Sequence, residues 1–158
     1  ESAVVRIIAN KKLFEAGIEG TSVPWWWLAG IMYRENDVNM SRQMLNGEPW
    51  SRKTTIVPKG LGPWNSWVES TKYAIKHMGL DRHPDWSMRA SLMRAERWNG
   101  MGYSRKGLRS PYLWAGTNFE QPGMYVADGK FDSNKVDPRI GVAAIWKRLD
   151  QLGFLRTV

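Results

Sequence analysis

The stretch that decides the fold is PWWWLAGIMYREN, residues 24–36. It is an apolar run that ends in a cation, a carboxylate and an amide. On a helix Leu28, Ile31 and Glu35 share one face, so the carboxyl continues a stripe expected to be buried. Arg34 is turned about 100° away from that stripe. The stretch therefore predicts a buried core helix that carries Glu35 at its C-terminal end.

Two physical effects are expected to raise the pKa of Glu35. Burial disfavours the charged form of a carboxyl group, and a helix C-terminus carries partial negative charge. A carboxylic acid in such a place can donate a proton near neutral pH. The alternative is that Glu35 is simply the first solvated residue after a core helix.

Length and composition predict one compact, single domain over residues 1–158, because 158 residues with 42% hydrophobic content can bury one good core. We expect a monomer. No stretch reaches the roughly 18 apolar residues of a membrane span, so no transmembrane segment is expected. The chain has no cysteine and therefore no disulfide.

The charge and the tryptophan content indicate the kind of partner. A net charge of +8 favours an anionic partner such as nucleic acid, a membrane surface or the bacterial cell wall. Ten tryptophans are more than a small core absorbs, so several are expected on a surface or in a groove. Flat rings there suit sugars or unstacked bases.

Helix start and stop signals predict a mainly α, α+β fold with about five main helices. The expected helices are Ser2 to Glu15, a tryptophan helix capped by Thr21 or Ser22, Ser66 to His77 with a capping box, one capped by Asp85 that ends near Asn99, and one opened by Asp137-Pro138 that ends at Gly153. Two long irregular regions, 40–65 and 101–136, are expected to be functional, and the first to hold a short hairpin around 54–57.

Several chemistries lack the residues that they need. Only His77 and His83 are present, without cysteine or a His-Glu-x-x-His pattern, so no metal site and no cofactor are expected. No Gly-x-Ser-x-Gly elbow is present for a nucleophilic triad. A cell-wall peptidase would need one of these groups, and none is found.

Glycoside cleavage fits the residues better. It needs one protonated carboxyl near the leaving oxygen, which Glu35 can supply, and aromatic platforms that hold the sugar chain. Among the aromatic residues, Trp67 is expected in the core. For Trp64, Tyr112 and Trp114, which lie in loops, groove lining and packing are about equally expected.

Three segments resemble the lysozyme-like superfamily of muramidases and lytic transglycosylases. Residues 32–36, MYREN, look like the end of its catalytic helix, although Asn36 stands where Ser is common. Residues 98–103, WNGMGY, resemble an aromatic-Asn-Gly-x-Gly-Tyr element of phage muramidases, and 110–118, SPYLWAGTN, resemble the loop that follows it. The chain is most similar to the virion lytic enzymes of enveloped double-stranded RNA bacteriophages. No Gly-Leu-Met-Gln motif of cellular transglycosylases is present.

The resemblance implies a lysozyme-like fold with a small β element and a substrate cleft. It implies cleavage of the β-1,4 bond between N-acetylmuramic acid and N-acetylglucosamine, with Glu35 as the catalytic acid. Asn99 and Tyr103 would orient Glu35 and bind the sugar on the other side of the bond. The implied partner is bacterial peptidoglycan, and the implied location is a phage virion acting on the cell wall in the periplasm.

The outcome of cleavage depends on a second carboxylate. A hydrolase needs one to activate water or to act as nucleophile, and Glu48 is the best candidate, although it also fits a solvated turn. Without one, Glu35 can act as acid and then as base toward the sugar's own C6 hydroxyl, which leaves a 1,6-anhydro product. We favour this transglycosylase route.

The rival class is a basic aromatic module that binds single-stranded nucleic acid. It explains the charge and the rings but leaves Glu35 without a use. Lysine and arginine are scattered along the chain rather than concentrated in a run, so no specific nucleic-acid partner is expected.

Overall fold

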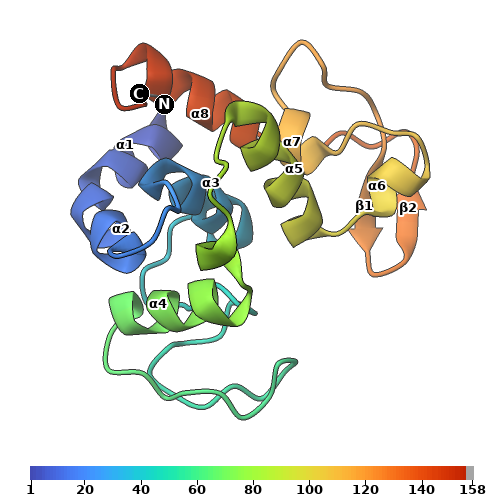
Figure 1. The fold of residues 1–158 in the computed structure, drawn as a ribbon. Helices are drawn as coiled ribbons and strands as arrows, with labels where there is room; N and C mark the ends of the chain where they lie inside the picture. Colours follow the sequence, from blue (N-terminus) through green and yellow to red (C-terminus); the bar gives the residue numbers. More distant parts are fainter. Residues whose placement is uncertain (156–158) are drawn as a thin grey trace. The chain divides into compact units, whose positions relative to one another are not determined.

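The computed structural model describes residues 1–155 and is mainly helical, with one small two-stranded sheet (Figure 1). This agrees with the predicted α+β class. The described chain divides into two compact units, Glu1–Trp86 (unit 1) and the part from Ser87 onward (unit 2). No helix within residues 1–155 is long and apolar enough to cross a membrane.

Unit 1 contains four α-helices and one short 3-10 helix. Its elements are α1 (Ser2–Ala9), α2 (Lys11–Ile18), α3 (Trp25–Asn36), α4 (Trp67–His77) and the short 3-10 helix η1 (Leu80–Arg82). Helix α2 packs against both α3 and α4. The close approach of α2 to α4 depends on Gly17, where a Cβ atom would lie only 2.9 Å from Thr71 Cγ2. Phe14 of α2 meets Trp67 of α4 edge to face, and Trp67 is buried as predicted.

The predicted single helix from Ser2 to Glu15 is wrong, because the chain breaks at Asn10. Asn10 leaves helical geometry with φ −103° and ψ 9°, and its side-chain amide donates to the Arg6 carbonyl at 2.9 Å. An asparagine side chain that bonds the backbone competes with the helical ladder. Two shorter helices therefore replace one.

Two predicted helix starts, at Ser2 and Ser66, are confirmed, and three are displaced. The Ser66 hydroxyl accepts from the Glu69 amide at 3.0 Å, so Ser66 caps α4 as predicted. The Glu69 carboxylate accepts from the Asn65 amide at 3.0 Å rather than from the Ser66 amide, so the predicted capping box forms only in part. The tryptophan helix begins after Pro24 without a side-chain cap, rather than at Thr21 or Ser22. The last two of the predicted helices begin later in the chain than expected. One begins after Ser87 instead of Asp85, and the other after Gly141 instead of Asp137.

Unit 2 contains α5 (Met88–Asn99), α6 (Gly102–Arg105), α7 (Pro111–Trp114), the strands β1 (Met124–Ala127) and β2 (Lys130–Asp132), and α8 (Val142–Gln151). Helix α8 buries Val142, Ile145, Trp146 and Leu149 and packs against α7 and α5. Gly141 permits this packing, since a Cβ atom there would lie 2.3 Å from the Leu113 carbonyl oxygen.

The predicted hairpin at residues 54–57 is wrong, since these residues form no strand. The antiparallel hairpin lies in the second irregular region instead, where Tyr125 pairs with Phe131. Its turn is Asp128-Gly129, with Gly129 at φ 68°. Asp-Gly between strands is a strong hairpin signal, and Thr54 to Val57 has only β-propensity.

Candidate active site

Glu35 lies in the last turn of α3 and is exposed, whereas Arg34 is buried with 5% of its surface accessible. This reverses the predicted orientation, in which Glu35 continued the buried stripe. The reason is that α3 is covered on nearly all sides over residues 26–32, so helical period does not identify one buried face. The carboxyl group is therefore accessible to a ligand.

The chain turns sharply just after Glu35, and this turn is firmly held. Asp37 and Val38 both have left-handed backbone geometry, with φ 58° and 61°. The Asp37 amide donates to the Tyr33 carbonyl at 3.0 Å and the Val38 amide to the Met32 carbonyl at 3.3 Å, so both left-handed residues are bonded back to the end of α3. A β-branched residue at positive φ is a genuine outlier, and such strained residues concentrate at functional sites.

Side chains also secure this turn. The Asn36 side-chain oxygen accepts from the Asn39 amide at 2.9 Å, and Arg6 forms an ion pair with Asp37. Asn36 thus has a local structural role. The helix end places Glu35 on a fixed backbone.

Glu48 is held very differently, because its carboxylate is surrounded by donors from its own loop. It accepts from the Thr55 hydroxyl at 2.6 Å and from the Thr55 amide at 2.9 Å. The Ile56 amide and the Asn46 side chain donate to it at 3.2 and 3.0 Å. These bonds, the Thr55 hydroxyl foremost, lower the pKa of Glu48 below its ordinary 4.5 against the opposing effect of desolvation.

Only 8% of the Glu48 surface is accessible, so the carboxylate is ionised, buried and committed to the loop. A base that activates water needs an accessible lone pair and a pKa near the working pH. The geometry therefore favours a structural role for Glu48 over that of a second catalytic carboxylate.

Trp64 is mainly a packing residue. It is buried and lies against Tyr73, with the ring centroids 5.5 Å apart. Glu35, Glu48 and Trp64 all belong to unit 1.

The other candidate residues belong to unit 2, and they differ in exposure. Asn99 is the last residue of α5 and is exposed. Tyr103 and Tyr112 are buried. The Tyr103 hydroxyl accepts from the Tyr125 amide at 2.9 Å, and its ring meets that of Tyr125 edge to face. Tyr103 therefore anchors the hairpin, a contact that the sequence reasoning missed although the Asp-Gly turn could have indicated it.

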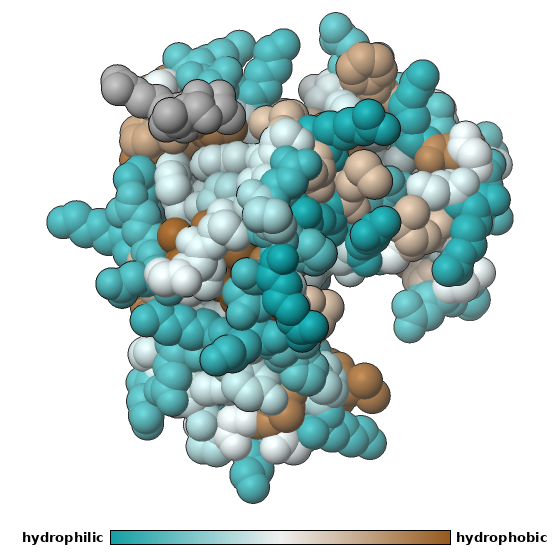
Figure 2. Space-filling view, viewed as in Figure 1, coloured by the Kyte–Doolittle hydropathy of each residue, from teal (hydrophilic) through white to brown (hydrophobic). Residues whose placement is uncertain are grey.

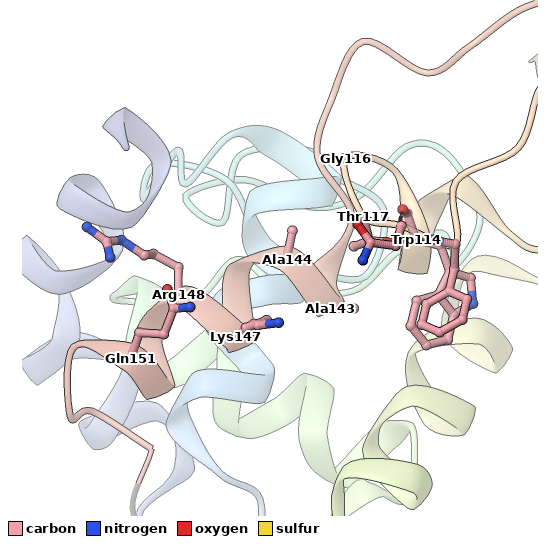
Figure 3. Close-up of a pocket in the computed structure, with 10 residues that line it drawn as sticks. Trp114, Gly116, Thr117, Ala143, Ala144, Lys147, Arg148 and Gln151 are labelled. Atoms are coloured by element: carbon pink, nitrogen blue, oxygen red, sulfur yellow. Dashed lines mark hydrogen bonds between the residues drawn. The ribbon is translucent and has the colours of Figure 1, made fainter.

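Trp114 is half-buried and lines a cavity of about 360 Å³ within unit 2 (Figure 3). Phe119, also missed from the sequence, meets Trp114 with centroids 5.2 Å apart and completes the aromatic wall. The opposite wall is the outer face of α8, where Ala143 and Ala144 leave room. Lys147 extends from α8 toward the side of Trp114, whereas Arg148 extends the other way (Figure 3).

This cavity combines ring faces, an ammonium group and polar groups, a mixture that suits a saccharide or another partly polar ligand. Within residues 1–155, no group of three or more His, Cys, Asp or Glu side chains is placed to hold a metal ion.

No family model, curated protein or solved structure matches this chain. The chain's own residues are therefore the basis for a function.

Proposed function

We propose that this protein cleaves the glycan strands of bacterial peptidoglycan, with Glu35 as its catalytic acid. The observation that carries the proposal is the placement of Glu35. An accessible carboxyl group ends a helix whose body is buried and whose following turn is held in strained left-handed geometry. Rigid placement of an exposed acid serves a reaction better than it serves stability.

The proposed reaction uses one carboxyl group twice. Glu35 gives its proton to the glycosidic oxygen as the bond from that oxygen to C1 of N-acetylmuramic acid breaks, which frees the N-acetylglucosamine hydroxyl. The Glu35 carboxylate then takes the proton of the C6 hydroxyl while the C6 oxygen bonds to C1. The product is a 1,6-anhydro sugar, no water is consumed, and Glu35 regains its proton.

The environment of Glu48 supports this route over hydrolysis. A hydrolase needs a second carboxylate near the bond that breaks, and Glu48 is already saturated by donors from its own loop. The hydrolytic alternative then depends on another acid.

Glu35 is exposed in the free protein, so a bound substrate can add desolvation at this carboxyl group. A glycan strand that covers the carboxyl on binding would disfavour its charged form. Asn99 and Trp114 have accessible surface for substrate contacts, whereas Tyr103 and Tyr112 would act by shaping unit 2. The net charge of +8 suits an anionic cell wall, and the proposed setting is a phage virion enzyme that acts in the periplasm.

The test is digestion of purified peptidoglycan, followed by mass analysis of the soluble muropeptides. The proposal expects anhydro products, one water lighter than reducing-end products, and a rate reduced about 10²- to 10⁴-fold in Glu35→Gln. Glu19→Gln is the matched control, because Glu19 is also exposed in unit 1 and directly follows the C-terminal end of a helix, α2.

Products that carry the additional water would contradict the anhydro route but retain glycan cleavage. Full activity of a folded Glu35→Gln variant, or no release of muropeptides by the wild type, would overturn the proposed function.

A further inference from the structure

The loop of residues 51–61 exposes apolar side chains at its tip. Ile56 and Val57 have 54% and 80% of their surface accessible. A single exposed aliphatic residue is ordinary, but two adjacent ones at a loop tip form a small apolar surface. Figure 2 shows hydrophobic colour at the lower right edge of the molecule, where Figure 1 places this loop.

The loop is rigidly built, so the exposure of its tip is not a consequence of poor packing. Thr54 is buried, and its hydroxyl donates to the Pro58 carbonyl at 2.6 Å and accepts from the Leu61 amide at 3.0 Å. The Thr54 amide donates to the Leu61 carbonyl at 2.9 Å, which closes the base of the loop. On the other side Glu48 holds the amides of Thr55 and Ile56.

A second layer of polar groups supports these bonds. The Asn46 side chain donates both to Glu48 and to the Ile56 carbonyl, at 3.0 and 3.2 Å. Gln43, which is fully buried, donates to the Asn46 side-chain oxygen and accepts from the Leu45 amide. A buried polar network of this size specifies one loop conformation.

Cations flank the apolar tip. Arg52, Lys53 and Lys59 are all exposed, and residues 49–61 contain no acidic side chain. The nearest carboxylate along the chain, Glu48, is buried and occupied by donors from the loop. The loop surface therefore combines two exposed aliphatic side chains with three flanking cationic side chains.

We infer that this loop docks on the surface of an anionic lipid bilayer, with Ile56 and Val57 in the interfacial layer and the three cations at lipid phosphates. Aliphatic tips with flanking lysine and arginine are the pattern of interfacial membrane contacts. Residues 51–61 contain no aromatic ring, so they lack the flat faces that stack on sugars or bases.

The absence of cysteine from the chain permits a site-specific test. Val57→Cys, labelled with an environment-sensitive fluorophore, is mixed with phosphatidylglycerol vesicles or with phosphatidylcholine vesicles. The label is expected to enter an apolar environment only with the anionic vesicles. Val5→Cys is the control, because Val5 is 62% exposed on α1 of the same unit.

Charge variants measure the electrostatic part by vesicle co-sedimentation. Each cation near an anionic surface changes affinity about fivefold, so Lys53→Gln with Lys59→Gln should weaken binding roughly 25-fold. Lys12→Gln with Lys76→Gln gives the same net charge from exposed sites outside the loop and is expected to have little effect. Binding should also weaken with salt.

Three outcomes would overturn the inference. The first is that the Val57 label stays in water with anionic vesicles, and the second is that the two pairs of lysine substitutions weaken binding equally. The third is that Ile56→Ser with Val57→Ser slows digestion of lipid-free peptidoglycan, which would place the loop tip on the glycan. Glu35→Gln is expected to bind vesicles like the wild type, so failure of the proposed cleavage and failure of membrane docking are separate results.

Discussion

The end of α3 and the loop that contains Glu48 each present a glutamate in unit 1, and the two are held in opposite ways. Around Glu35 the backbone is fixed and the carboxyl is accessible. Around Glu48 the carboxylate holds the loop in place by accepting hydrogen bonds from loop residues, among them the Thr55 hydroxyl. The comparison teaches that two glutamates of one unit can differ in exposure, because the segments that surround each side chain differ.

Exchange of each carboxyl for an amide should separate the two roles most strongly. Glu35→Gln is expected to lose about 10²- to 10⁴-fold in peptidoglycan cleavage while it stays folded. Glu48→Gln is expected to melt at a lower temperature, because an amide cannot accept from all the donors, and to retain cleavage wherever it is folded. Parallel activity assays and thermal melts check this, and an inactive but fully stable Glu48→Gln would return Glu48 to the catalytic candidates.

Removal of the second anchor of the loop should have a smaller effect, on stability alone. Thr54→Val keeps the shape of a buried side chain but removes the bonds to the Pro58 carbonyl and the Leu61 amide. The expected loss is about 1–3 kcal/mol in the free energy of unfolding, measured by chemical denaturation. Thr21→Val is a useful contrast, since Thr21 bonds the Ile18 carbonyl outside this loop.

The lowered pKa of Glu48 predicts a dependence of stability on pH. The stabilisation is present above the ordinary value of 4.5 and is lost as the pH falls through the lower pKa of the folded state. The difference in melting temperature between wild type and Glu48→Gln should therefore shrink below pH 4.5. Curves that stay parallel through that range would show that Glu48 gains nothing from ionisation.

The smallest effect is expected at the turn after Glu35. Asp37→Gly relieves a left-handed conformation, worth about 1 kcal/mol, and gives up an exposed ion pair with Arg6 worth less than about 1 kcal/mol. The net change should be a slight gain in the free energy of unfolding. Slower cleavage in this more stable variant would show that the strained turn positions Glu35, and unchanged cleavage would confine its role to ending the helix.

Helix punctuation was the part of the fold most accessible from the sequence. The cap at Ser66 and the end of that helix at His77 are confirmed, because caps depend on residues within one turn. The start of α8 was placed too early at Asp137, because the Asp137 side chain instead accepts from the Arg139 amide in a turn before the helix. Local signals identify where a helix can begin, and packing decides which signal is used.

The candidate site was predicted in its residues but not in its environments. The position of Glu35 at the end of an apolar run identifies it as a candidate, but helical periodicity predicts a buried side chain and Glu35 is exposed. For Glu48 the sequence allows either a catalytic base or a solvated turn residue, and in the structure its side chain is buried. The sequence does not predict that Phe119 and Lys147 line one cavity. They are far apart in the chain, and only tertiary packing brings the loop at residue 119 next to the helix that begins at Val142.

By itself the chain determined that this protein is mainly helical, basic and rich in tryptophan, with a glutamate at the end of its most apolar helix. Those properties follow from composition and from contacts within a few residues. Only the tertiary structure decided that Arg34 is buried and Glu35 exposed, and that Glu48 holds a loop. The physical reason is that burial and hydrogen bonding at these positions depend on segments distant in the sequence, which cover one side chain and leave the next in water.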